Sequence, residues 1–185
     1  MALMRDLLLP LMMWALAGAT AFGNSPEQSS PEYQLKAVFL FNFAQFVEWP
    51  ASAFPEPDTP LSICILGEDP FGGYLDETVR GETVANHPLS VRRYRTVEQI
   101  KGCHILFVSR KEQAHLSEIL DSLKGHSVLT VSDAERFVSR GGMIRFVTDH
   151  NRIRLRINLE AARAANLTLS SKLLRPAQIV PAGKD

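Results

Sequence analysis

CHILFV, at residues 103–108, is the stretch that decides the fold class of this chain. It is a short apolar run with β-branched and aromatic residues, so it predicts a strongly buried strand. LSICIL at residues 61–66 and VLTV at residues 128–131 have the same character. Strands of this kind are typical of parallel sheets whose two faces are covered by helices.

Helical segments separate these strands. Residues 71–79 predict a short helix that ends at Gly81, and residues 111–123 predict an amphipathic helix that ends at Gly125. Residues 89–94 predict a further strand between the two helices. The alternation of short strands with helices indicates an α/β fold with a mainly parallel sheet.

The pattern changes after a predicted short helix at residues 134–139. Residues 143–148 and 152–159 predict two strands, and the short connection at 149–151 makes them an antiparallel hairpin. Further elements are expected as a helix at 161–165, a strand at 167–169 and a turn at 171–174. The predicted sheet is therefore mainly parallel, with an antiparallel edge near the C-terminus.

An aromatic helix precedes the sheet. From residue 32, apolar residues that include Phe39 and Phe43 recur at steps of three and four. Trp49-Pro50 ends this helix, because the residue before a proline avoids the helical conformation. Lys36 alone supplies a basic polar face, so burial in the domain is favoured over a position on a membrane surface.

The first residues predict an export signal. A weakly basic start at Arg5 precedes an apolar run at residues 7–17, and Ala19 and Ala21 have the spacing that a signal peptidase accepts. The run is about 11 residues long, against the roughly 20 that a bilayer span requires, so a membrane anchor is the weaker interpretation. We expect a cleaved signal at 1–21, a flexible leader at 22–31, one domain at 32–180 and a tail at 181–185.

The charge balance and the cysteine content limit the classes of function that the sequence supports. The chain has 20 basic and 20 acidic residues, and binding of nucleic acid, which needs a basic surface, is not supported. Cys64 and Cys103 permit one disulfide in an exported protein, and the alternative is two buried thiols. Both cysteines lie in strand-like segments, which favours the bond.

No motif for catalysis or metal binding is present in the sequence. The chain has no glycine-rich phosphate loop, no GxSxG elbow and no HExxH. A zinc site could in principle form from Cys64, His87, Cys103 and His104. Successive residues of a strand point to opposite faces, however, so Cys103 and His104 are not expected to bind one ion together. We therefore expect a binding protein without catalytic residues, metal or cofactor.

One candidate ligand site is the carboxyl edge of the predicted sheet, where open α/β sheets usually bind ligands. Gly67, Glu68 and Asp69 follow one strand, and Ser109 and Arg110 follow another. The alternative is that these are ordinary strand-to-helix turns, in which such residues are favoured for their backbone geometry.

A candidate partner-binding surface is the strand RIRLRI. Alternation with period two places Arg152, Arg154 and Arg156 on one face and aliphatic residues on the other. Parallel arginines repel one another unless an anionic group of the domain, a partner or a ligand faces them. The alternative is a solvated or internally paired face. Exposed side chains of the aromatic helix, with Phe39 and Phe43 as candidates, would complete the surface.

Eight stretches of the chain, taken in order, form a specific set. They are YQLKAVFLFNF at 33–43, FVEWP at 46–50, ICILG at 63–67, CHILFVS at 103–109, LTVSD at 129–133, GGMI at 141–144, IN at 157–158 and SSKLL at 170–174. This set resembles the YfiR family of periplasmic regulators, and it extends over nearly all of the chain after the predicted signal.

The resemblance implies a Rossmann-like three-layer α/β domain, often dimeric, with a disulfide between Cys64 and Cys103. It also implies a periplasmic protein that binds the periplasmic part of an inner-membrane diguanylate cyclase and represses it, which affects cyclic di-GMP and biofilm formation. An outer-membrane lipoprotein can titrate such a regulator away. A second, C-terminal cysteine pair of some members is absent here. The alternative is a periplasmic small-molecule sensor that acts on a different membrane receptor.

Overall fold

The computed structural model describes residues 29–150, 152–181 and 183–184. The predicted export signal and most of the predicted leader lie outside the described residues. Within the described part of the chain, no helix combines the length and the hydropathy needed to cross a membrane.

An eight-stranded sheet forms the centre of the domain, in the order β10-β8-β7-β6-β5-β2-β4-β3. Its strands are β2 (Leu61–Leu66), β3 (Thr83–Val84), β4 (His87–Tyr94), β5 (Ile105–Val108), β6 (Leu129–Ser132), β7 (Ile144–Asp149), β8 (Arg152–Ile157) and β10 (Gln178–Ile179). β4, β2, β5, β6 and β7 run parallel, whereas β8 is antiparallel to β7. The mainly parallel sheet and the antiparallel hairpin are thus confirmed; β3 and β10 were not predicted.

The helices occupy most of the predicted positions. They are α1 (Pro31–Phe46), α2 (Tyr74–Val79), α3 (Leu116–Ser122), α4 (Leu159–Ala164) and α5 (Ser171–Leu174), and the 3-10 segments are η1 (Ala51–Ala53), η2 (Val97–Gln99) and η3 (Arg110–His115). The predicted helix at 111–123 therefore begins as η3 and continues as α3. The aromatic helix ends at Phe46, because Val47 and Glu48 form β1 and pair with β9 (Thr168–Leu169), outside the main sheet.

The predicted helix at 134–139 is wrong. Residues 134–141 form bends and turns, and Arg136 has a φ of 60°. A residue in this left-handed conformation cannot continue a right-handed helix. The segment therefore connects β6 to β7 as an irregular loop.

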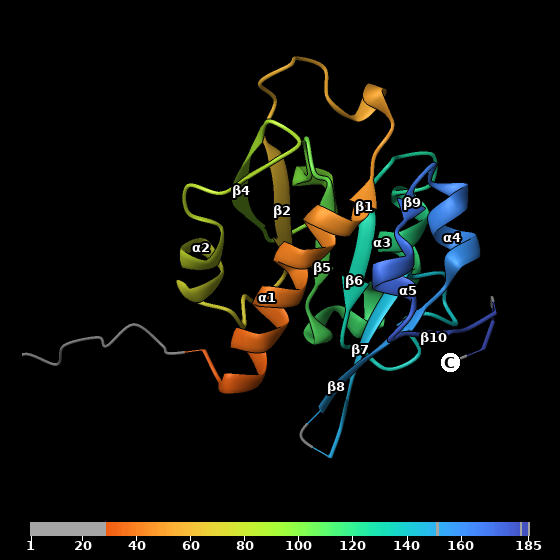
Figure 1. Cartoon of the computed structure of the whole chain (residues 1–185). Coiled ribbons are helices and arrows are strands. Elements are labelled where there is room, and N and C mark those ends of the chain that lie inside the picture. Colours follow the sequence, from red (N-terminus) through yellow and green to blue (C-terminus); the bar gives the residue numbers. More distant parts are fainter. Residues whose placement is uncertain (1–28, 151, 182, 185) are drawn as a thin grey trace, which may run out of the picture.

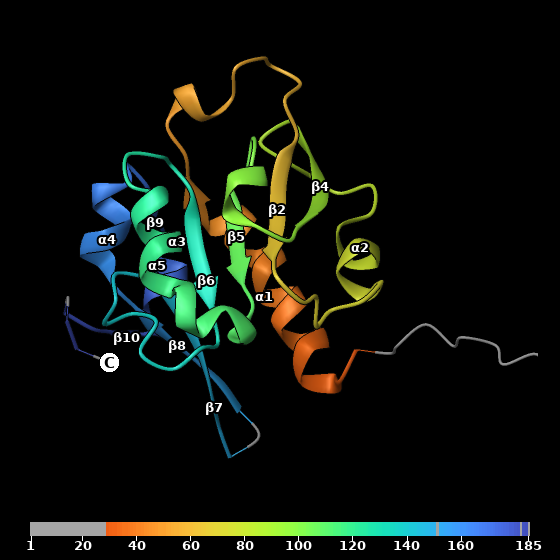
Figure 2. The same ribbon diagram turned by 180° about the vertical axis from the view of Figure 1, so that it is seen from behind.

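Helices cover both faces of the sheet. α1 crosses one face together with α2 and α5 (Figure 1), and the view from behind shows α3 on the opposite face (Figure 2). Along β5, Phe107 belongs to the hydrophobic core that contains α1 residues, and Leu106 belongs to the core that contains α3 residues. Both faces of the strand are therefore buried, which explains why CHILFV is apolar without interruption.

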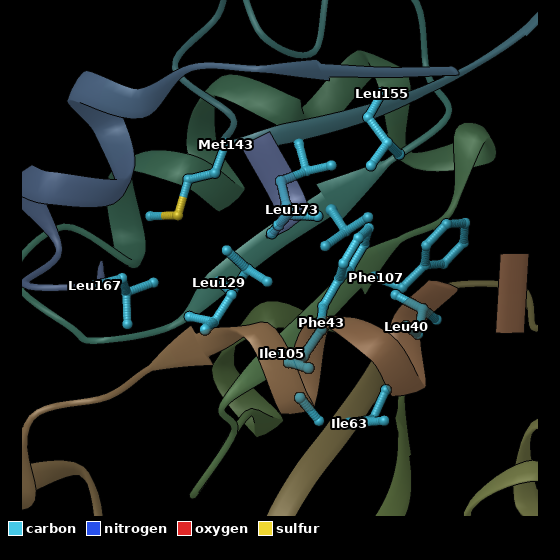
Figure 3. Packing of buried hydrophobic residues seen from close by; sticks show 14 of the residues in the cluster. Leu40, Phe43, Ile63, Ile105, Phe107, Leu129, Met143, Leu155, Leu167 and Leu173 are labelled. Atoms are coloured by element: carbon cyan, nitrogen blue, oxygen red, sulfur yellow. The ribbon is translucent and has the colours of Figure 1, made fainter. Parts of the chain in front are cut away.

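The larger core lies between α1 and the sheet. Figure 3 shows Leu40 and Phe43 of α1 in the same cluster as strand residues Ile105 and Phe107. All four side chains are completely buried. Full burial of a leucine or phenylalanine side chain contributes about 1.5–3 kcal/mol, so this contact fixes α1 on the sheet.

Candidate functional site

β7 and β8 form a hairpin that projects beyond the rest of the sheet (Figure 1). β6 pairs only with Ile144 and Arg145 of β7, and β10 pairs only with Arg156 and Ile157 of β8. The intervening residues of the two strands pair with each other. We call this projecting part, residues 146–150 and 152–155, the hairpin arm.

The hairpin arm carries exposed arginines on one face. Arg152 and Arg154 are exposed, Ile153 is half-buried and Leu155 is buried, as the alternation in the sequence requires. Arg154 Nε lies 3.7 Å from Asp149 Oδ2, and this exposed pair contributes at most about 1 kcal/mol. Arg152 has no ion pair with another described residue. The face therefore retains positive charge that an anionic group could meet.

α1 has exposed apolar side chains, and a half-buried aromatic residue of the same helix packs on the arm. Leu35 is 46% exposed and Val38 is 36% exposed. Phe39 is half-buried and packs on Phe146 of β7, with ring centroids 5.8 Å apart. Phe43, which the sequence proposed for the same surface, faces the sheet and is completely buried, stacked on Phe146. Phe43 therefore holds α1 on the arm and presents no surface to a partner.

Charged side chains surround the buried pair of Lys36 and Asp133, where the N-terminal turn of α1 meets the carboxyl edge of the sheet. Lys36 is completely buried, and its Nζ lies 2.6 Å from Asp133 Oδ2 and 2.6 Å from Glu32 Oε1. The Tyr33 hydroxyl donates to Asp133 Oδ2 at 2.8 Å, and Arg110 Nη2 lies 3.2 Å from the same oxygen. We call these five residues the Lys36 cluster.

The charges of the Lys36 cluster determine how its acids titrate. Burial alone would raise the pKa of Asp133, but the hydrogen bond and charge of Lys36, with Tyr33 and Arg110, hold it below its ordinary value. The hydrogen bond from Lys36 likewise lowers the pKa of Glu32. Burial, together with the negative charge of Asp133, raises the pKa of Tyr33. Both carboxyl groups are therefore ionised at neutral pH, and Tyr33 keeps its proton.

The Lys36 cluster connects the hairpin arm to the carboxyl edge. Glu32 Oε1 also accepts a hydrogen bond from the Thr148 hydroxyl at the end of β7, at 2.9 Å. A cavity of about 410 Å³ lies here, lined by residues of the cluster and of β7. Asp133 Oδ1 is buried and has no hydrogen-bond donor among the described residues. The network thus positions the arm relative to α1.

Part of the predicted ligand edge is occupied by internal contacts. Asp69 accepts from the backbone N–H of Phe71 at 2.7 Å and pairs with Arg93 at 2.7 Å. Glu68 forms an ion pair with Lys111. These contacts are those of a strand-to-helix turn, so they favour the structural interpretation of this loop.

The contacts of Gly67 and Ser109 likewise favour a structural role in the strand-to-helix turns. Gly67 has a φ of 87°, which strains any residue with a Cβ, and a Cβ there would also displace the side chain of Glu112, whose Oε1 would lie 2.6 Å away. Ser109 is buried, and its N–H donates to the carbonyl of Leu66. Of the five predicted edge residues, Arg110 is the one that belongs to the Lys36 cluster. The sequence offered one signal for that cluster, a lysine inside an apolar helical stripe.

The disulfide joins the middle of β2 to the chain just before β5. Cys64 of β2 and Cys103 before β5 are bonded, with their Cα atoms 6.0 Å apart, so the predicted pairing is confirmed. Both side chains are buried on the side that α3 covers. Within the described part of the chain, no group of histidine, cysteine, aspartate and glutamate side chains is placed to bind a metal ion.

His104, which follows Cys103 in the chain, is buried as a neutral ring. Its Nδ1 accepts from the backbone N–H of Ser62 at 3.1 Å, and its Nε2 lies 3.0 Å from the carbonyl of Ala53, to which it donates. The ring stacks on Phe54, with centroids 4.5 Å apart. Burial lowers the pKa of His104. The histidine thereby attaches the loop at residues 51–60 to the sheet.

His104 is expected to make the domain less stable in mild acid. Because its pKa is lowered in the fold, the unfolded chain binds this proton more readily, and stability falls as pH drops below about 6.5. His104→Asn, which retains an acceptor but does not titrate, should lose stability less steeply over this range. Urea unfolding at several pH values measures this, with exposed His126→Asn as the control. An unchanged slope in His104→Asn would contradict the assignment.

A family model covers most of the chain. It is described as YfiR/HmsC-like, and it matches residues 33–178. The matched segment begins in α1 and ends in β10, so it includes the disulfide, the hairpin arm and most of the Lys36 cluster. No curated protein matches the chain.

Proposed function

Because the chain belongs to the YfiR/HmsC-like family, we propose that it is a periplasmic regulator of cyclic di-GMP signalling. In this proposal it binds the periplasmic part of an inner-membrane diguanylate cyclase and keeps that enzyme inactive, which lowers cyclic di-GMP and opposes biofilm formation. The family match carries the proposal. We also propose, from the family match, that the domain is of the Rossmann-like three-layer type. The arrangement of helices supports this proposal, because α3 covers one face of the sheet and α1, α2 and α5 cover the other.

Repression requires a difference between two affinities. A regulator shifts its receptor toward the inactive state only if it binds that state more tightly. A hundredfold shift in population requires about 2.7 kcal/mol of differential affinity. A few contacts at the centre of an interface can provide this amount.

The proposed contact surface combines the hairpin arm with the exposed side of α1. Arg152 and Arg154 provide charge, and Arg156 lies on the same face of β8. Phe39, which packs on the arm, and Leu35, which is exposed one turn earlier on the same helix, provide apolar area. An outer-membrane lipoprotein that competes for this surface would release the cyclase.

A small-molecule sensor is the second candidate function. The cavity of about 410 Å³ beside Arg110 and Asp133 favours it, because it lies where α/β sheets usually bind ligands. In that case a bound ligand would alter the Lys36 cluster and, through Glu32, the position of the arm.

Capture from detergent-solubilised envelopes tests the regulator proposal. With the tagged chain lacking residues 1–21, we expect a membrane protein with a cytoplasmic cyclase domain to co-purify. Arg154→Glu should recover about tenfold less of it, because a reversed charge at an interface opposes its partner. Arg163→Glu, the same change at an exposed position of α4, is the control. Recovery of a different receptor would refute the cyclase assignment, and recovery of none would favour the sensor.

A further inference from the structure

Among the described residues, none forms a strand beside the outer edge of β8 at residues 152–155. β10 pairs with the last two residues of β8 only, where Val180 N–H donates to Ile157 O. Backbone groups of a strand point alternately to its two sides, so Ile153 and Leu155 direct theirs to the same outer side as Ile157. Figures 1 and 2 show the hairpin arm projecting away from the other elements.

An exposed strand edge is a template for another extended chain. The added strand gains main-chain hydrogen bonds, and the alternating side chains of the template select its sequence. The stretch at 152–155 contains no proline that would block such pairing. Its two arginines are exposed on one face, and its aliphatic residues, Ile153 and Leu155, face the side on which α1 lies.

The charge of the arm selects the chemistry of the added strand. A second copy of this chain paired through β8 would bring Arg152 and Arg154 of both copies onto one face, and like charges on neighbouring strands are destabilising. A strand with carboxylates on that face would instead form charge-assisted hydrogen bonds with the guanidinium groups. Its intervening residues would extend the apolar face of Ile153 and Leu155.

We propose that an extended segment of the partner, with acidic and apolar residues in alternation, adds as a β-strand along residues 152–155 of β8. The acidic side chains contact Arg152 and Arg154, and the apolar ones continue the face of Ile153. The identity of the partner as a membrane receptor rests on the proposed function. The mode of binding rests on the unpaired edge and the exposed arginines of the hairpin arm.

A designed peptide tests this mode directly. The probe is a capped heptapeptide in which glutamates alternate with valines, titrated into the disulfide-bonded chain while backbone amide signals are followed by NMR. We expect saturating shifts centred on Ile153 and Leu155. A peptide with lysines in place of the glutamates, and one with N-methylated amides on its pairing edge, should each bind about tenfold more weakly.

Variants of the arm provide the matching test. Ile153→Pro removes an outward N–H without removing a hydrogen bond between β7 and β8, and it should weaken binding of the glutamate peptide, whereas Ile153→Ala keeps that donor. The double variant Arg152→Glu with Arg154→Glu should prefer the lysine peptide, a reversal that misfolding would not produce.

The outcomes separate this inference from the proposed function. Strand addition would be overturned if the N-methylated peptide bound as tightly as the unmodified glutamate peptide. It would also be overturned if millimolar glutamate peptide caused no shifts. The arginines would then serve to prevent two copies of the strand from pairing. Concentration-dependent loss of the same amide signals without peptide would make a second copy the occupant. If the Ile153→Pro variant captures a cyclase as well as the wild type does, the inference fails and the proposed function stands. If the peptide binds but no cyclase is captured, only the proposed function fails.

Discussion

Lys36→Met is expected to lower the free energy of unfolding by about 3 kcal/mol. The substitution preserves the volume of the side chain but leaves the carboxylate of Asp133, which is 2% exposed, without the ammonium group 2.6 Å away. Breaking a buried ion pair on one side costs about 3–5 kcal/mol. The lower end of this range applies, because Tyr33 and Arg110 remain bonded to the same oxygen. Urea denaturation of both proteins at neutral pH measures the difference.

Two further variants make the Lys36 prediction specific. Asp133→Asn removes the unpaired charge, so the double variant with Lys36→Met should be more stable than Lys36→Met alone. Lys124→Met removes an ion pair of similar length, 2.6 Å to Asp121, but both of those side chains are mostly exposed. It should change the free energy of unfolding by less than about 1 kcal/mol. Equal effects of the two lysine substitutions would show that the Lys36 cluster does not stabilise the domain.

Removal of the disulfide is expected to cost about 4 kcal/mol. Cys64 and Cys103 are 39 positions apart, and in the chain-entropy model a loop of this length restricts the unfolded chain by that amount. Natural domains are stable by about 5–15 kcal/mol, so the Cys64→Ala, Cys103→Ala double variant would lose a large part of its stability. Equilibrium unfolding of this variant and of the wild type gives the comparison.

Thiol titration provides the control for the disulfide prediction. The denatured, unreduced wild-type chain should contain no free thiol, because both of its cysteines are in the bond. A loss of less than about 1 kcal/mol in the double variant would contradict the entropic argument. Detection of two free thiols would instead show that the bond does not form in the isolated protein.

The strands and the hairpin could be predicted because their signals are local. A parallel strand between two helical layers must be apolar at successive positions, as LSICIL and CHILFV are. The hairpin follows from the short connection between two strands at residues 149–151, which permits only an antiparallel pair. The disulfide was favoured for a related reason, because both cysteines lie in or beside such strands.

The accessible surface of α1 could not be predicted from the helix alone. Phe39 and Phe43 are one turn apart on a wide apolar stripe, and both are aromatic. The sheet covers Phe43 completely and leaves Phe39 half-buried. Similarly, the left-handed conformation of Arg136 prevents the predicted helix at 134–139. Left-handed residues are most often glycines, so an arginine at this position gave no sign of it in the sequence.

The sequence by itself determined most of the strands and helices and the alternation of charge along β8, because hydrophobic period and turn chemistry act over a few residues. Only the tertiary structure decided what these elements do together. Lys36 and Asp133 are 97 positions apart, and neither residue shows in the sequence that the other will neutralise it. Burial made that pair necessary, since an ion without a partner cannot leave water at low cost. The order of the described strands likewise leaves the outer edge of β8 unpaired at residues 152–155, and no local sequence pattern indicates this.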